Sequence, residues 1–282
     1  MIVTGASRLA GVIGWPVQHS RSPRMHGFWL ERYRIDGAYL PLAVRPANLK
    51  AALAGISAMG FEGCNLTIPH KEAALGLVDE MTPIATKIGA VNTVIVRKDG
   101  SLLGDNSDAF GFMENLRVGA PGCDFTDGPA VVLGAGGSSR AVCAALKDAG
   151  AVEIRLLNRT LERSENMAKA FGAIVQPLPW ETRANALDKA TLLVNTTSLG
   201  MDGQPPLDLD LSLLPLDAVV NDLVYSPLTT DLLAAAAGRG NITVDGLGML
   251  LHQGRPGFKA WFGIAPEVTD DLRTFVASDL VS

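Results

Sequence analysis

The chain has 282 residues, of which 48% are hydrophobic and 19% are charged, and its formal net charge is −5. These proportions exclude an intrinsically disordered chain and argue against a general nucleic-acid binder. No run approaches the ~18 apolar residues of a membrane span, and the odd count of three cysteines favours a reducing compartment. We therefore expect a soluble cytoplasmic protein whose partners include neither nucleic acid, membrane nor metal.

Short β-rich runs alternate with helical stretches along the whole chain. Strands are expected at Leu9–Ile13, Ala38–Ala43, Gly60–Leu66, Val91–Val96, Ala130–Leu133, Glu153–Leu157, Leu192–Asn195, Ala218–Asn221 and Ile242–Val244. Helices are expected at Pro23–Tyr33, Pro46–Met59, Lys71–Val78, Ala109–Leu116, Ser138–Asp148, Thr160–Ala170 and Leu228–Gly238. This alternation indicates βαβ units and a mostly parallel sheet, so the predicted fold class is α/β.

One internal boundary stands out. A chain longer than about 250 residues usually divides into two domains. The run Val118–Pro129 is rich in Gly, Pro and Asp, and an apolar strand-like segment follows it directly. That composition is typical of a linker, so a new domain is expected to open there.

A glycine-rich turn follows the expected strand Ala130–Leu133. Gly134 permits a tight turn, Gly136 lets the backbone approach a pyrophosphate, and a helix N-terminus follows with free N–H groups. Ser139 replaces the third glycine of the common dinucleotide pattern. The turn therefore favours a dinucleotide site, and a ligand-free strand-to-helix turn is the alternative.

The end of the next expected strand indicates which dinucleotide. An NAD site usually has Asp or Glu there, which accepts a hydrogen bond from the ribose 2′-hydroxyl. This chain has Asn158 and Arg159, with Arg163 one helical turn further on. Guanidinium groups bind a 2′-phosphate, which a carboxylate would repel. The sequence therefore predicts NADP rather than NAD.

Four short motifs lie at expected strand ends and helix starts of the first domain. They read HSRSP (His19–Pro23), NLTIPHK (Asn65–Lys71), GAVNT (Gly89–Thr93) and GDNSD (Gly104–Asp108). Ligands of α/β proteins bind at such places. The hydroxyls, amides, ammonium and carboxylate of these motifs suit a small polyhydroxylated acid.

These four motifs, followed in order by GAGGSSR, NRT and DGLGML, closely resemble the shikimate dehydrogenase family. The resemblance extends over nearly the whole chain. It implies an NADP-dependent oxidoreductase that reversibly reduces 3-dehydroshikimate to shikimate, in the biosynthesis of chorismate and aromatic amino acids. It also implies a monomer or a homodimer.

The resemblance assigns two catalytic residues, Lys71 as the acid/base and Asp108 as its partner. It assigns substrate binding to those two residues and to Ser20, Ser22, Thr67, Asn92, Tyr225 and Gln253. The serine pair resembles the hydroxyls that hold the substrate carboxylate. Asn92 resembles the amide that contacts ring hydroxyls.

On the cofactor side, the resemblance assigns the pyrophosphate to Gly134, Ala135, Gly136, Gly137 and Ser138. The 2′-phosphate falls to Asn158, Arg159, Thr160 and Arg163, and the nicotinamide lies near Leu223 and Gly246. A substrate domain with a mixed sheet is expected over residues 1–112, and residues 252–282 are expected to pack back on it. A Rossmann-like domain is expected over residues 113–251, with the active site in the cleft between domains.

Other interpretations of the same residues remain open. Lys71 can be a solvated surface lysine, and Asp108 and Ser22 can cap helices. One rival function is a quinate/shikimate dehydrogenase that uses NAD, and another is a non-catalytic dinucleotide sensor. Pro256 and Gly257 fall inside the expected late helix and are predicted to kink or end it.

Overall fold

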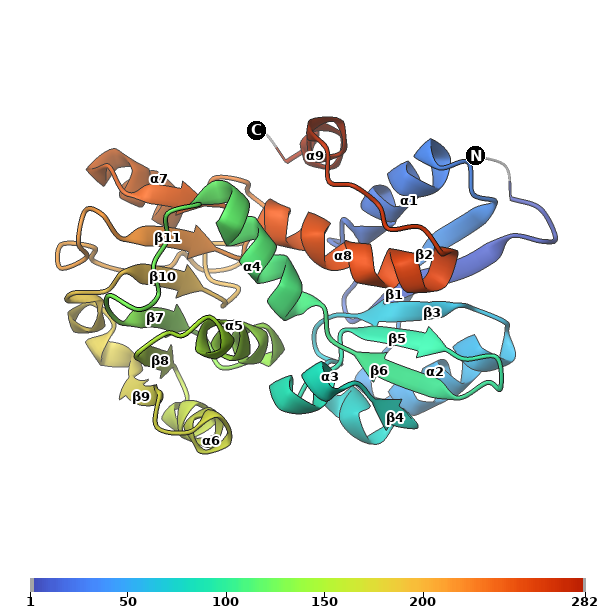
Figure 1. Cartoon of the computed structure of the whole chain (residues 1–282), viewed down its shortest axis with the longest axis horizontal. Helices are drawn as coiled ribbons and strands as arrows, with labels where there is room; N and C mark the ends of the chain where they lie inside the picture. The colour runs from blue at the N-terminus through green and yellow to red at the C-terminus, as the bar shows by residue number, and fades with distance from the viewer. Residues whose placement is uncertain (1–2, 281–282) are drawn as a thin grey trace. The chain divides into compact units, whose positions relative to one another are not determined.

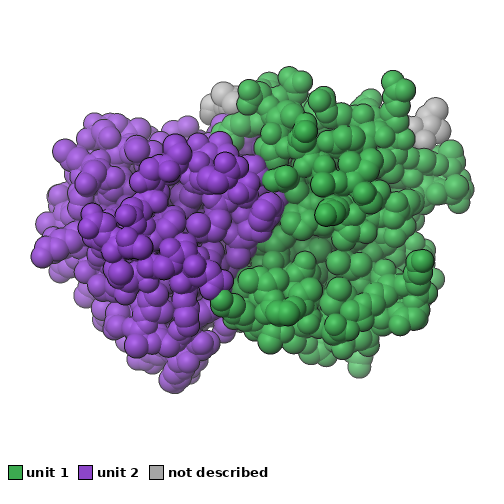
Figure 2. All heavy atoms as spheres, viewed as in Figure 1, with its two compact units in different colours: residues 1–108, 253–276 green, residues 109–252, 277–282 purple. Residues whose placement is uncertain are grey.

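The computed structural model describes residues 3–280 and divides into two compact units. Unit 1 comprises residues 1–108 and 253–276, and unit 2 comprises residues 109–252 and 277–282 (Figure 2). The expected domains, 1–112 with 252–282 and 113–251, differ slightly from these units in their limits, and their binding roles remain predictions.

Unit 1 is built on a mixed sheet (Figure 1). Its strands are β1 (Arg8–Gly14), β2 (Gly37–Ala43), β3 (Gly63–Leu66), β4 (Glu80–Met81), β5 (Thr93–Val96) and β6 (Leu102–Asp105). Its helices are α1 (Ser22–Arg32), α2 (Leu49–Ala58), α3 (Pro83–Ile88) and α9 (Asp270–Ala277), with short 3-10 turns at Pro46–Asn48 and Ala73–Gly76. The strand order is β2-β1-β3-β5-β6-β4, and β5 alone runs against its two neighbours.

The sheet of unit 1 buries apolar side chains on both faces. On one face, α2 places Leu53 and Ile56 in a core cluster with Ile13 and Val94. The other face carries an aromatic cluster, in which the Trp261 indole donates a hydrogen bond to the Val94 carbonyl (3.0 Å). Apolar residues on two faces explain why these strands read as nearly continuous hydrophobic runs.

A histidine lies inside the aromatic cluster. The His26 ring stacks on Tyr39 with 3.9 Å between ring centroids, and Trp29 and Phe258 also pack against it. His26 is completely buried, and burial lowers its pKa to about 3. A neutral imidazole at this site is a core residue.

The long helix α8 (Gly246–Phe262) corrects one of the two alternatives predicted for Pro256 and Gly257, namely that the helix ends there. It runs through Pro256 without ending there, although proline removes one backbone hydrogen bond. Phe258, Trp261 and Phe262 lie beyond the proline and are buried, which offsets a cost of roughly 3 kcal/mol. Gly257 is required for packing, because a Cβ there would lie 2.8 Å from the Trp261 ring.

Unit 2 has a wholly parallel sheet (Figure 1). Its strands are β7 (Ala130–Leu133), β8 (Ile154–Asn158), β9 (Val175–Pro179), β10 (Leu192–Asn195), β11 (Val219–Asp222) and β12 (Ile242–Val244). Its helices are α4 (Asp108–Gly119), α5 (Gly137–Asp148), α6 (Leu161–Phe171) and α7 (Asp231–Arg239), with 3-10 turns at Trp180–Thr182 and Asn185–Leu187. The strand order is β12-β11-β10-β7-β8-β9.

The chain adds β8 and β9 on one side of β7 and then adds β10, β11 and β12 on the other side, so the order of the strands reverses between β7 and β10. Right-handed crossovers then place α5 and α6 on one face and α7 on the other. In agreement, Leu232 and Leu233 of α7 share a core cluster with Val131 and Leu133 of β7. Such a reversal point is where doubly wound sheets bind nucleotides.

Several elements differ from the sequence-based expectations. The helix expected at Lys71–Val78 is only a 3-10 turn, because the Val91 amide donates to the Lys71 carbonyl (2.8 Å) and diverts that backbone group from a helix. Strands β4, β6 and β9 and helix α3 were not expected. Of the described residues, no helix is both long and apolar enough to cross a bilayer.

Candidate active site

Four loops meet at one edge of the unit 1 sheet. Strands β1, β3 and β6 run in the same direction and end at that edge, where β5 begins. Lys71 follows β3, Asp108 follows β6, and Asn92 directly precedes β5. The topology therefore gathers three of the predicted site residues from distant parts of the chain.

Lys71 and Asp108 form an ion pair. The Lys71 Nζ atom lies 2.5 Å from Asp108 Oδ2. The Asp108 side chain is completely buried, whereas the lysine side chain keeps 13% of its surface exposed. A ligand can therefore reach the ammonium group while the carboxylate is held away from water.

Asn92 holds the second oxygen of the carboxylate. Its Nδ2 donates to Asp108 Oδ1 (2.8 Å) and contacts Gln253 Oε1 (3.3 Å), while its Oδ1 accepts from the Ser107 amide (2.9 Å). The Asp108 amide in turn donates to Asn106 Oδ1 (2.9 Å). This network fixes the Asp108 carboxylate. Among residues 3–280, Lys71 is the one cationic side chain that contacts this carboxylate.

The two predicted serines and Thr67 follow β1 and β3. Ser22 begins α1 and is nearly buried, and its amide donates to Ser20 Oγ (3.3 Å). The Thr67 amide donates to the Ile13 carbonyl (2.9 Å), which ties it to the end of β1. Gly14 is required here, because a Cβ would lie 2.5 Å from the Thr67 methyl group. These hydroxyls therefore belong to the same edge of the sheet as Lys71.

The glycine turn of unit 2 is fixed by hydroxyl groups. Gly134 has φ +106°, and a Cβ there would lie 2.6 Å from Thr196 Oγ1, so only glycine fits. The Ser139 hydroxyl accepts from the Gly136 amide (3.2 Å) and bonds to Thr196 Oγ1 (2.5 Å). Ser139 thus ties the start of α5 to the end of β10, at the position where the common pattern has glycine.

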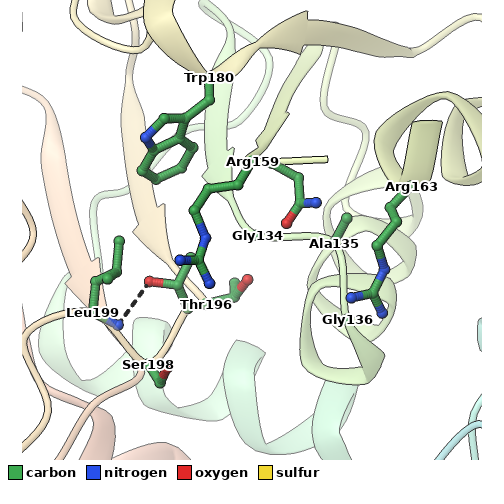
Figure 3. Close-up of a pocket in the computed structure, with 11 residues that line it drawn as sticks. Gly134, Ala135, Gly136, Arg159, Arg163, Trp180, Thr196, Ser198 and Leu199 are labelled. Carbon is green, nitrogen blue, oxygen red and sulfur yellow. Dashed lines mark hydrogen bonds between the residues drawn. The ribbon is translucent and has the colours of Figure 1, made fainter. Parts of the chain in front are cut away.

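A pocket opens beside this turn (Figure 3). It is lined by Gly134, Ala135, Gly136, Asn158, Arg159, Arg163, Trp180, Thr196, Thr197, Ser198 and Leu199. Six predicted cofactor residues are in that lining. Gly137 and Thr160 directly follow lining residues and Ser138 follows Gly137, but none of these three lines the pocket. Two guanidinium groups and no carboxylate face the pocket, a donor set that fits a phosphate.

Sequence reasoning missed part of this lining. Trp180 follows β9, which was not expected to be a strand, and residues 196–199 follow β10. The end of β10 was predicted correctly, and ligands bind beyond the carboxyl ends of such strands. That rule could have identified Thr196–Leu199 as candidate lining residues, because they directly follow β10.

Three predicted residues lie elsewhere in unit 2. The Gly246 amide donates to the Val224 carbonyl (3.3 Å), and a Cβ on Gly246 would lie 2.2 Å from the Leu223 carbonyl oxygen. The start of α8 and the segment from Leu223 to Tyr225 are therefore in close contact. None of these residues lines the pocket beside the glycine turn.

A second buried carboxylate ends β11. Asp222 accepts hydrogen bonds from Asn195 Nδ2 (2.9 Å), the Val224 amide (3.0 Å) and the Thr230 hydroxyl (2.7 Å). Burial raises the pKa of Asp222 to about 6, although these hydrogen bonds lower it. Within residues 3–280 no group of three or more His, Cys, Asp or Glu side chains is placed to hold a metal ion.

Two family models match the chain. One, described as the shikimate dehydrogenase substrate binding domain, matches residues 12–94, and the other, described as shikimate / quinate 5-dehydrogenase, matches residues 120–200. The shikimate dehydrogenase (NADP(+)) of Paramagnetospirillum magneticum is 60% identical over 276 residues, which cover 98% of this chain and 100% of that protein. The chain belongs to the shikimate dehydrogenase family.

Solved structures of similar proteins share the fold. Shikimate 5-dehydrogenase from Thermus thermophilus, in complex with NADP(H) and shikimate, matches with a TM-score of 0.84 and 39% identity, over 97% of this chain and 100% of that chain. Quinate dehydrogenase from Corynebacterium glutamicum, in complex with NAD, matches with a TM-score of 0.88 and 32% identity, over 96% of this chain and 99% of that chain. The predicted α/β fold and the predicted resemblance to the shikimate dehydrogenase family are confirmed.

Proposed function

We propose that the chain catalyses the reversible NADPH-dependent reduction of 3-dehydroshikimate to shikimate, a step toward chorismate and the aromatic amino acids. The observation that carries this proposal is the Lys71–Asp108 pair, which is held at 2.5 Å at a sheet edge rich in hydroxyl and amide groups. Membership of the shikimate dehydrogenase family supports the choice of substrate.

Unit 1 supplies most of the proposed substrate contacts. Ser20 and Ser22 offer hydroxyls to the substrate carboxylate, and Thr67 offers another hydroxyl to the ring. Asn92 and Gln253 are in hydrogen-bond contact with each other (3.3 Å), so their amides present one polar surface to the ring hydroxyls. Tyr225 is the one proposed substrate contact that belongs to unit 2.

Lys71 handles the proton in this proposal. Reduction of the ketone places negative charge on its oxygen, and the Lys71 ammonium stabilises that charge and donates a proton to it. In the oxidation direction, the neutral amine takes the proton from the alcohol. Asp108 orients the ammonium and accepts a hydrogen bond, so lysine and aspartate act as one coupled unit.

Unit 2 would hold the cofactor. The backbone from Gly134 to Ser138 would hold the pyrophosphate, and Asn158, Arg159, Thr160 and Arg163 would hold the 2′-phosphate. Leu223 and Gly246 would lie near the nicotinamide, which would supply hydride when the cofactor is bound. The absence of a carboxylate from the lining of the described pocket supports NADP over NAD.

Compartment and assembly remain predictions from the sequence. The three cysteines, all among the described residues, are free thiols, which is consistent with a reducing, cytoplasmic location. A monomer and a homodimer are both compatible with the chain. Size-exclusion chromatography with light scattering distinguishes these two states.

An absorbance assay at the nicotinamide band tests the function. Purified protein is given shikimate or quinate, each with NADP or NAD. We expect turnover with shikimate and NADP, and catalytic efficiency at least tenfold lower with NAD, because charge-assisted hydrogen bonds to the 2′-phosphate contribute about 1.5–3 kcal/mol. Equal efficiency with both cofactors contradicts the NADP assignment. Preference for quinate favours the rival dehydrogenase, and cofactor binding without turnover favours a sensor.

A further inference from the structure

Trp180 is the one aromatic residue of the pocket beside the glycine turn. It follows β9 directly, so it lies at the carboxyl edge of the unit 2 sheet. We propose that the indole of Trp180 stacks on the adenine ring of the dinucleotide and sets much of its affinity. This inference rests on the proposed NADP-dependent function.

The other lining residues account for the charged parts of the cofactor. The glycine turn offers backbone N–H groups to the pyrophosphate, and Arg159 and Arg163 offer guanidinium groups to a phosphate. Apart from its ribose, an adenosine phosphate also has a flat, largely apolar purine. Trp180 is the largest apolar side chain of the lining, and Figure 3 shows its ring directed into the same pocket as the Arg159 side chain.

The indole is held in place before any ligand arrives. Trp180 packs against the core cluster of unit 2, and the Arg183 guanidinium carbon lies 5.3 Å from the ring centroid. Arg183 is itself fixed by a hydrogen bond from its Nε to the Asp208 carbonyl (3.0 Å). A rigid ring loses little conformational entropy when a base stacks on it.

The position of the ring favours adenine over nicotinamide. Trp180 shares the pocket with Arg159 and Arg163, which are proposed for the adenosine 2′-phosphate. Leu223 and Gly246, which are proposed to lie near the nicotinamide, are outside that lining. The indole therefore faces the adenosine half of the cofactor.

Adenosine 2′,5′-bisphosphate tests this inference, because it carries the adenine and the 2′-phosphate but no nicotinamide. Its dissociation constant is measured by calorimetry for the native chain and for W180F and W180L. Stacking of a base on an aromatic side chain is strong enough that W180L is expected to bind about tenfold more weakly, or worse. W180F retains an aromatic ring and is expected to lose no more than about threefold.

Fluorescence provides a second readout. The bisphosphate is expected to quench tryptophan emission of the native chain and not that of W180F, because the other three tryptophans lie in unit 1. W15L is the matched control, since Trp15 is an exposed tryptophan of unit 1. It is expected to retain both the affinity and the quenching.

The outcomes separate the two proposals. Native affinity in a folded W180L, or quenching that persists in W180F, overturns the role of Trp180 and leaves the proposed function standing. If W180L does not fold, the loss or persistence of quenching in W180F still decides the matter. A native chain that binds neither NADP nor the bisphosphate overturns the proposed function, and the role of Trp180 with it.

Discussion

Asp108 and Asp222 are both completely buried carboxylates at the carboxyl edge of a sheet, one in each unit. Asp108 has the Lys71 ammonium at 2.5 Å. Among residues 3–280, Asp222 receives hydrogen bonds only from the neutral groups of Asn195, Val224 and Thr230. Accordingly, burial raises the pKa of Asp222 to about 6.

From this difference in partners we infer different roles for two buried acids of similar placement. A carboxylate that is paired with a partly exposed ammonium keeps a charge pair available for proton chemistry. A carboxylate surrounded by neutral donors joins structural elements, here the ends of β10 and β11 to Thr230, the N-cap residue of α7. Charge changes at the first site are therefore expected to alter turnover, and changes at the second to alter stability.

The largest effect is expected for Lys71→Ala. General acid/base catalysis contributes about 10²–10⁴-fold, so kcat should fall by about 10³-fold while the dissociation constant of NADP stays within about twofold. Initial rates and calorimetry measure the two quantities. Lys50→Ala, at an exposed position of α2, is the control and should behave as the native chain. Turnover that survives Lys71→Ala removes the lysine from its proposed role.

The second effect is on stability and concerns Asp222→Asn. The pKa of Asp222 is about 6 in the fold against a reference of 3.8, so the folded chain binds a proton that the unfolded chain has lost between these values. Asp222 therefore makes its whole contribution to the free energy of unfolding below pH 4. That contribution, about 3 kcal/mol, is lost as the pH rises through 6. Asparagine does not ionise, so the variant does not lose this stability as the pH rises. The Thr230 hydroxyl, which donates to Asp222 in the native chain, can rotate to accept a hydrogen bond from the new amide.

Denaturant unfolding at pH 4, 5, 6 and 7 measures this prediction. The free energy of unfolding of the variant, relative to the native chain, should increase from pH 4 to pH 7. Asp217→Asn changes an exposed aspartate of the same unit and should show no such trend. A difference that is independent of pH would mean that Asp222 is ionised throughout.

Arg159→Ala is expected to act on binding alone. Loss of a charge-assisted hydrogen bond to the 2′-phosphate should raise the dissociation constant of NADP by about 10- to 100-fold. NAD affinity and kcat at saturating NADP should change by less than about twofold, because neither depends on the 2′-phosphate. Arg117→Ala removes an exposed arginine of the same unit as a control. An equal loss for NAD and NADP places the arginine elsewhere.

The smallest effect is expected for Ser139→Ala. The serine hydroxyl joins the Gly136 amide to Thr196, and one such hydrogen bond contributes about 0.5–1.5 kcal/mol. The melting temperature should fall by about 2–4 °C. Ser138→Ala is the matched neighbour, and a fall of the same size there would show that the tie to β10 has no special effect.

The fold was predictable where strands are apolar and regular. Ala130–Leu133 and Leu192–Asn195 were predicted with the limits that β7 and β10 have, because both are fully buried central strands. The missed strands lack that signal. β4 has only two residues, β6 contains Gly104, and β9 is an edge strand with two prolines. Their pairing is decided by neighbouring strands that lie far away in the sequence.

The candidate site was predictable from motifs but not from local chemistry. Lys71, Asn92 and Asp108 were found because short motifs resemble a family, and only the mixed topology explains why they meet. Trp180 belongs to no motif identified in the sequence. It follows β9, whose sequence does not have the pattern of a strand. The continuation of α8 through Pro256 depends on tertiary burial of the residues beyond it. Such effects are not encoded in a local window.

Unit 1 is discontinuous, since residues 253–276 complete it after the whole of residues 109–252 has intervened. During synthesis on a ribosome, the Val94 carbonyl therefore lacks its hydrogen bond from the indole of Trp261 until that residue, 167 positions later, has been made. Until α8 emerges from the exit tunnel, this face of the nascent unit 1 sheet is covered only in part, by α1, although unit 2 by then has its full set of strands. A chaperone that shields apolar surface would consequently be needed most at the first unit, in the interval before the last helices emerge.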